Sequence, residues 1–152
     1  MFVTYANSPG WLNEDVHDIQ FGASVYDSPQ QYIRLSPEFQ MPKTTAALLF
    51  EAGARASAVN MIGAAKAARR EGNPAEYLIY PAEGHNLRQA KFVRQSALVN
   101  LDWFRFWLQD IEDPIPEKTE QYKRWRQMRG DSCERWKAES MRDLPHYCEA
   151  AW

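Results

Sequence analysis

The sequence lacks the features that mark several common classes of protein. Its 152 residues include no apolar run near the roughly 20 residues that a membrane-spanning helix needs. Lys and Arg number 18 against 20 Asp and Glu, and this net charge of −2 argues against nucleic-acid binding. The first residues contain neither the basic nor the apolar segment of a signal peptide. We therefore expect a cytoplasmic protein that binds neither a membrane nor nucleic acid.

Cysteine is scarce, and both residues of this type, Cys133 and Cys148, stand near the C-terminus. They do not form a CxxC pair, and no His lies at zinc-ligand spacing from them. No metal ion or other cofactor is predicted. A disulfide that closes the tail would require an exported chain. Two free thiols are the interpretation that fits a cytoplasmic protein.

The Gly-x-Ser-x-Gly motif, which places a nucleophilic serine on a sharp strand-to-helix turn, is also absent. No serine of the chain lies between two glycines at that spacing, and we interpret all of them as turn and surface residues. They are Ser8, Ser24, Ser28, Ser36, Ser57, Ser96, Ser132 and Ser140.

The pattern that is present is typical of an α/β protein. Apolar runs at residues 44–50 and 75–80 predict two buried strands. The Ala-rich segment 58–71 between them predicts a helix, which Gly72 would cap. Strand–helix–strand units form parallel pairs. We therefore predict an α/β fold with a few parallel strands flanked by helices.

A long helix is predicted at residues 88–109, with one apolar stripe that would pack on the sheet and two tryptophans that widen it. Two strands alone make no stable sheet, so we expect a part outside this chain to complete it. The stripe consists of Val93, Ala97, Leu101, Phe104 and Leu108, and the tryptophans are Trp103 and Trp107.

The candidate catalytic residue is His85. The strand at 75–80 ends before Pro81, and His85 follows on a loop in which Gly84 is predicted to allow close approach of the backbone. Such a loop at the rim of a sheet can present a general base, although a plain polar histidine is the alternative. Glu83 could contact His85 but is predicted to be a solvated charge. The other two histidines, His17 and His146, are predicted to be surface residues.

A catalytic histidine of this kind needs a serine nucleophile and an acid that orients the imidazole. The acid would follow the first strand, past Gly53, where the chain reads Ala-Arg-Ala-Ser-Ala and holds no carboxylate. Arg55 stands near that position. Glu51, at the strand end, could replace the acid only if the geometry allowed it.

These segments together resemble the C-terminal end of the α/β-hydrolase domain in prolyl oligopeptidase-type serine peptidases. The tail is similar to bacterial members, including the lasso-peptide isopeptidase branch. The segments that carry the resemblance are YIRLSP at 32–37, ALLFEAG at 47–53, AAKAARREG at 64–72, EYLIYPAEGH at 76–85, LDWFRFWL at 101–108 and EQYKRWR at 120–126.

The resemblance implies that His85 is the catalytic base, that Arg55 occupies the acid position, and that a peptide is the substrate. The serine elbow would lie upstream of the matching region, so the chain resembles a truncated piece. It divides into an irregular lead-in at 1–44, the C-terminal portion of the peptidase domain at 45–110, and a helical or irregular tail at 111–152. A polar helix in that tail is predicted to end at Gly130.

We expect no peptidase activity from the isolated chain, because it lacks the serine elbow and the acid. Two alternatives remain open. The chain could be one half of a split peptidase, completed by an upstream partner chain; a homo-oligomer is the other assembly considered. It could instead be a non-enzymatic binding module that reuses the strand–helix–strand unit.

Overall fold

The computed structural model describes residues 18–53, 58–139 and 143–149. Strands β1 (Leu48–Gly53) and β2 (Ala75–Tyr80) pair in parallel, with Leu48 opposite Ala75 and Gly53 opposite Tyr80. Helix α4 (Ala58–Arg70) connects them. This arrangement confirms the predicted α/β fold, and the strand and helix bounds lie within a few residues of those expected.

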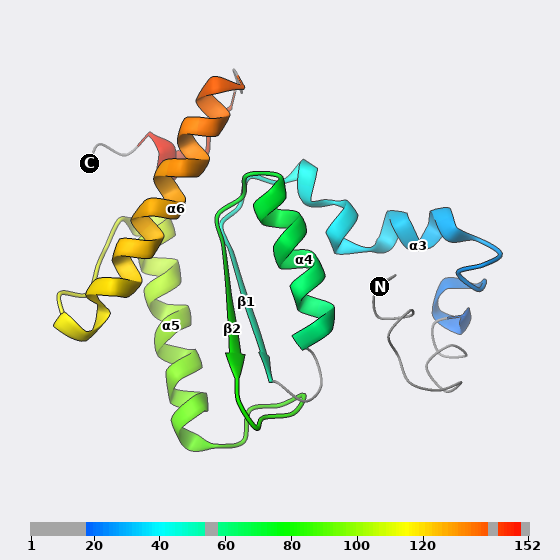
Figure 1. The fold of residues 1–152 in the computed structure, drawn as a ribbon, viewed down its shortest axis with the longest axis horizontal. Helices are drawn as coiled ribbons and strands as arrows, with labels where there is room; N and C mark the ends of the chain where they lie inside the picture. The colour runs from blue at the N-terminus through cyan, green and yellow to red at the C-terminus, as the bar shows by residue number, and fades with distance from the viewer. Residues whose placement is uncertain (1–17, 54–57, 140–142, 150–152) are drawn as a thin grey trace.

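Helices α4 and α5 (Ala90–Gln109) lie on opposite sides of the strand pair, as Figure 1 shows. Alanines allow α4 to approach the strands closely, since Ala64 and Ala68 pack with Ala75 in one buried cluster. Gly72 ends the helix as predicted, with a φ of 88° in the left-handed region that favours glycine. Its N–H donates to the Arg69 carbonyl at 3.1 Å.

The apolar stripe predicted for α5 is not the buried face of that helix. Leu101, Phe104 and Leu108 are 45%, 56% and 60% exposed. The two tryptophans of the prediction are buried, as expected for core residues. They pack in one cluster with residues of helix α6 (Thr119–Ala138) as well as with residues of the strand layer. The helical period was therefore predicted correctly, but the face that it buries was not.

Helix α6 continues through Gly130, where the sequence predicted its end. A glycine inside a helix costs only about 1 kcal/mol relative to alanine. Burial of Cys133 and Trp136 in the following turns outweighs that cost, because both side chains enter the main core. Residues 131–138 therefore belong to the helix rather than to an irregular segment that follows it.

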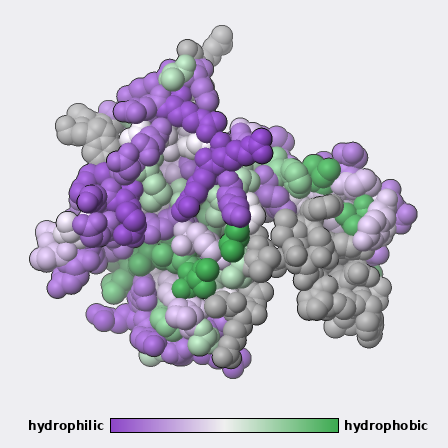
Figure 2. Space-filling view, viewed as in Figure 1, coloured by the Kyte–Doolittle hydropathy of each residue, from purple (hydrophilic) through white to green (hydrophobic). Residues whose placement is uncertain are grey.

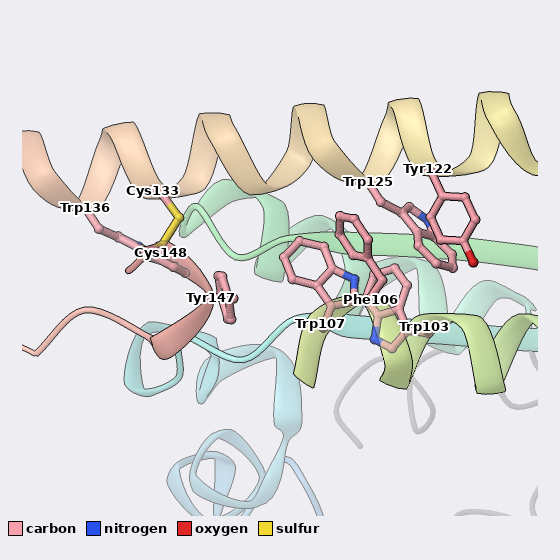
Figure 3. Close-up of a cluster of buried hydrophobic side chains, with 9 residues drawn as sticks. All are labelled: Trp103, Phe106, Trp107, Tyr122, Trp125, Cys133, Trp136, Tyr147 and Cys148. Carbon is pink, nitrogen blue, oxygen red and sulfur yellow. A yellow bond between two sulfur atoms is a disulfide. The ribbon is translucent and has the colours of Figure 1, made fainter. Parts of the chain in front are cut away.

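The main core is an aromatic cluster between α5, α6 and the C-terminal segment (Figure 3). Ring pairs in T-shaped geometry connect its parts, such as Trp103 with Trp125 at 5.0 Å and Trp107 with Tyr147 at 5.1 Å. The cluster consists of Trp103, Phe106, Trp107, Tyr122, Trp125, Cys133, Trp136, Tyr147 and Cys148.

A disulfide joins Cys133 to Cys148, with the two Cα atoms 5.5 Å apart. The prediction of two free thiols is therefore wrong. The bond holds the C-terminal 3-10 turn (His146–Cys148) against α6, and Tyr147 of that turn is buried. The Tyr147 hydroxyl donates to the carbonyl oxygen of Thr45, just before β1. The tail is thus fastened to both α6 and the strand layer.

Helix α6 also contacts the edge of β2 through a buried carboxylate. Glu76 accepts hydrogen bonds from the indole N–H of Trp125 and from Arg124 Nη2, the latter at 2.9 Å. The outward side of α6 is hydrophilic in Figure 2, whereas hydrophobic side chains gather over α5 and the strands. The helix is therefore amphipathic, with its apolar side on the core.

Short helices lead into β1 and into α6. Their composition is rich in proline, which suits the first turn of a helix. They are α3 (Pro29–Leu35), two 3-10 turns (Pro37–Phe39 and Met41–Lys43) before β1, and a third 3-10 turn (Pro116–Lys118) before α6.

Candidate functional site

His85 lies on the loop that follows the carboxyl end of β2 and leads into α5. Its side chain is exposed, and it lines a hollow of about 340 Å³ together with Glu83 and Arg88. No hydrogen bond or ion pair joins His85 to any other residue in the described part of the chain. The imidazole is therefore accessible to a ligand, as a general base must be.

Glu83 is buried rather than solvated, with only 3% of its surface exposed. Its carboxylate accepts the backbone N–H of Arg88 at 2.8 Å and that of Gln89 at 3.0 Å. These hydrogen bonds, first the one from Arg88, hold the pKa of the Glu83 carboxyl below its usual value. The prediction of a solvated loop charge is wrong because the N–H groups of the two residues that lead into α5 bind this carboxylate, which also lies near the positive end of the helix dipole.

The loop that carries His85 rests directly on the end of β1. A Cβ atom at Gly53 would lie 2.0 Å from the Gly84 carbonyl oxygen and 2.8 Å from the Glu83 carbonyl carbon. Only glycine permits this approach. The carboxyl end of β1 therefore lies beside the His85 loop, as parallel pairing with β2 requires. Arg55, predicted near the acid position, lies outside the described residues.

Glu51 lies near the end of β1, but its carboxylate is engaged by other groups. It accepts hydrogen bonds from the Tyr80 hydroxyl, from Ser96 Oγ at 3.2 Å and from Asn100 Nδ2. Burial, and then the hydrogen bond to Glu51, raise the pKa of the Tyr80 phenol above its usual value. The residues come from β1, β2 and α5, so the network ties both strands to one helix.

This network was not predicted from the sequence. Ser96 and Asn100 are four residues apart and hence on one face of α5, which was the available signal. A pair of polar side chains beside an apolar stripe is common on exposed helix faces, however. Only the fold shows that this pair meets the Glu51 carboxylate.

The remaining site candidates lie apart from His85. His146 is exposed in the C-terminal turn and contacts the Tyr147 ring, which agrees with a surface residue. Ser132 is buried within α6, with 6% exposed, so the prediction of turn and surface serines is wrong for this residue. Ser36 lies at the turn between α3 and the next 3-10 turn, but it is also buried, with 0% exposed. Four further predicted positions lie outside the described residues, namely Ser8, His17, Ser57 and Ser140.

Metal binding and membrane crossing are two further properties to consider for the described residues. No group of three or more His, Cys, Asp or Glu side chains there is arranged to hold a metal ion. No helix within the same residues combines the length and the apolar character that crossing a membrane requires.

Comparison with known proteins adds to this geometry. The lasso peptide isopeptidase AtxE2 of Asticcacaulis excentricus is 48% identical over 58 residues, which are 37% of this chain and 8% of AtxE2. The chain is partly similar to a prolyl oligopeptidase-type serine peptidase. That similarity confirms the resemblance inferred from the sequence. No protein-family model matches the chain.

Solved structures of AtxE2 share the fold of this chain. One, a variant with Astexin3 bound, has a TM-score of 0.60 at 31% identity and matches 66% of this chain. Apo AtxE2 has a TM-score of 0.57 at 32% identity and matches 62%. This chain spans only 15% and 14% of those two chains. The likeness therefore concerns a small part of AtxE2.

Proposed function

We propose that this chain is the histidine-bearing part of a serine-type peptidase, in which His85 acts as general base. The observation that carries the proposal is the placement of His85. It is exposed on an anchored loop at the carboxyl ends of two parallel strands. Ligand and catalytic groups in open α/β sheets lie at that edge. The partial similarity to AtxE2, a lasso peptide isopeptidase, supports a peptide as the substrate of the complete enzyme.

The same residues predict that the isolated chain does not hydrolyse peptides. A Ser–His–acid mechanism requires a serine that the histidine deprotonates and an acid that fixes its tautomer. The sequence holds no Gly-x-Ser-x-Gly elbow, and neither Glu51 nor Glu83 is hydrogen-bonded to His85 among the described residues. His85 can supply one step of the reaction but not the nucleophile.

A transplant into AtxE2 tests the role of His85. Residues 75–89 of this chain would replace the corresponding segment of AtxE2, which keeps its own nucleophile and acid. We expect a chimera that cleaves Astexin3, with a loss on the order of a thousandfold or more in kcat when His85→Ala is added. A folded chimera whose activity is unchanged by His85→Ala would refute the proposal. The matched control is Pro81→Ala in the chimera, because Pro81 is exposed in the same transplanted segment and does not line the hollow beside His85.

The 152-residue chain alone is tested in a parallel assay with Astexin3. We expect no turnover above the His85→Ala background. Turnover that His85→Ala abolishes would show that the chain contains a complete site, and it would overturn the prediction of inactivity.

A split peptidase is the second candidate function, and the surface beside β1 favours it. The outer edge of β1 pairs with no strand in the described residues, and it has no proline or lysine to discourage pairing. The exposed α5 stripe flanks the side of the helix whose Ser96 and Asn100 reach β1. A partner that supplies further parallel strands could cover both. Phe104→Lys should then weaken association, while Ile115→Lys, at a similarly exposed site beyond α5, should not.

A further inference from the structure

We propose that Glu83 is a positioning residue for His85. Its carboxylate fixes the loop that presents the imidazole, and the close contact of that loop with Gly53 at the end of β1 helps to hold it. The inference rests on the proposed function, because positioning has a purpose only if His85 reacts. It adds a residue that acts through the backbone and does not touch the substrate.

The anchor acts on the residues that lead into α5. The N-cap residue Gln89 makes no side-chain cap of its own, so other groups must hold the entry to this 20-residue helix. Glu83, six residues upstream, accepts the N–H of Gln89 and also that of Arg88 before it. Its negative charge also suits the positive end of the helix dipole.

This arrangement closes the chain into a small ring. Glu83 lies at the start of the loop and binds the backbone at its end, and His85 lies between those two points. The loop cannot open without breaking both hydrogen bonds or exposing a buried carboxylate. Ala82, which precedes Glu83, adopts a φ of 63°, a left-handed conformation that turns the chain sharply into the ring.

A second contact holds this ring of residues against the end of β1. The Gly84 carbonyl oxygen and the Glu83 backbone rest on the Cα of Gly53 at the end of β1. Gly84 itself has open space around the position of a Cβ, so this glycine does not supply the close contact. His85 is thus displayed from a loop with two fixed points, one on α5 and one on β1. Neither fixed point involves the His85 side chain.

The experiment compares Glu83→Gln, Glu83→Asp and Glu83→Ala in the 152-residue chain. Amide hydrogen exchange at Arg88 and Gln89 and the NMR signals of the His85 ring report on the loop. We expect exchange at those two amides to be roughly tenfold faster in Glu83→Ala, with a broadened or shifted His85 ring signal and unchanged exchange in the aromatic core. Glu83→Gln keeps one acceptor oxygen and should show an intermediate effect. Glu83→Asp, one methylene shorter, should resemble Glu83→Ala.

Glu134→Gln is the matched control, because Glu134 is exposed on α6 and should change none of these signals. Equal exchange in Glu83→Ala and the parent chain, with an unmoved His85 signal, would overturn the proposal. So would acceleration spread evenly over all amides, which means a general loss of stability. If Glu83→Ala does not fold, Glu83→Gln decides between the same outcomes.

The AtxE2 chimera separates this inference from the proposed function. There, Glu83→Ala should lower kcat at least tenfold and leave KM nearly unchanged, since the substrate-binding groups remain. If His85→Ala leaves the activity of the chimera unchanged, the role of His85 as general base is refuted, but the measurements on the loop remain valid. If His85→Ala abolishes the activity of the chimera and Glu83→Ala leaves it unchanged, only the positioning role of Glu83 is refuted.

Discussion

The contact between Gly53 and the His85 loop makes a sharp prediction. Gly53→Ala places a Cβ 2.0 Å from the Gly84 carbonyl oxygen, far inside any real contact distance. The neighbour is backbone, which cannot rotate away as the end of a flexible side chain can. Either the His85 loop moves or the end of β1 does.

The cost can be bounded from known cases of overpacking. Adding a methyl group to a closely packed site costs about 1–3 kcal/mol. For a chain of this size each kcal/mol lowers Tm by roughly 2–4 °C, so Gly53→Ala should lower Tm by roughly 2–12 °C. Because the Glu83 backbone takes part in the same contact, exchange at the Arg88 and Gln89 amides should also increase.

Gly130→Ala provides the opposite case within the same chain. Gly130 lies inside α6, and nothing stands within 4 Å of a Cβ placed there. Alanine should therefore stabilise the helix by about 0.5–1 kcal/mol and raise Tm. Differential scanning fluorimetry or calorimetry of the two variants tests the sign. A Gly53→Ala protein that melts at or above the parent temperature would refute the close approach of loop and strand.

Two further predictions concern the tail and the response to high pH. The Cys133–Cys148 bond closes a 15-residue separation, so Cys148→Ser or a reductant should cost about 3 kcal/mol; an unfolding curve that a reductant leaves unmoved would contradict this. The raised pKa of Tyr80 means that the unfolded chain releases its proton first, so stability should fall as pH rises above about 10. Tyr80→Phe should flatten that alkaline decline in urea unfolding, and an equally steep decline would count against the buried network with Glu51.

The strand–helix–strand unit was predictable because local signals agreed there. The apolar runs of β1 and β2, the alanines of α4 and the glycine after it all indicate the same structure. The position of His85 at the carboxyl edge followed from that topology. No tertiary contact had to be known in advance, since parallel pairing fixes which strand ends meet.

Features that depend on contacts between distant segments could not be predicted in this way. The α5 stripe has a regular period, but α6 decides which face is buried, because Tyr122 and Trp125 stack on the other side. Gly130 alone indicates a helix end, and only the burial of Trp136 beyond it explains why the helix continues. Glu83 reads as a solvated charge until the uncapped start of α5 is placed beside it.

The carboxylates of Glu51 and Glu83, near the carboxyl ends of the strands, are both hydrogen-bonded to groups other than His85. Neither is therefore available to orient the imidazole. Glu51 binds three side-chain donors from β2 and α5, and Glu83 binds two backbone donors. To orient His85, either carboxylate would have to give up hydrogen bonds that hold the strands or the loop in place. The sequence between β1 and α4 adds no acid. If His85 acts as proposed, the acid that orients it comes from outside the described residues. Its source can be found by asking which polypeptide restores turnover to a chain whose loop is intact.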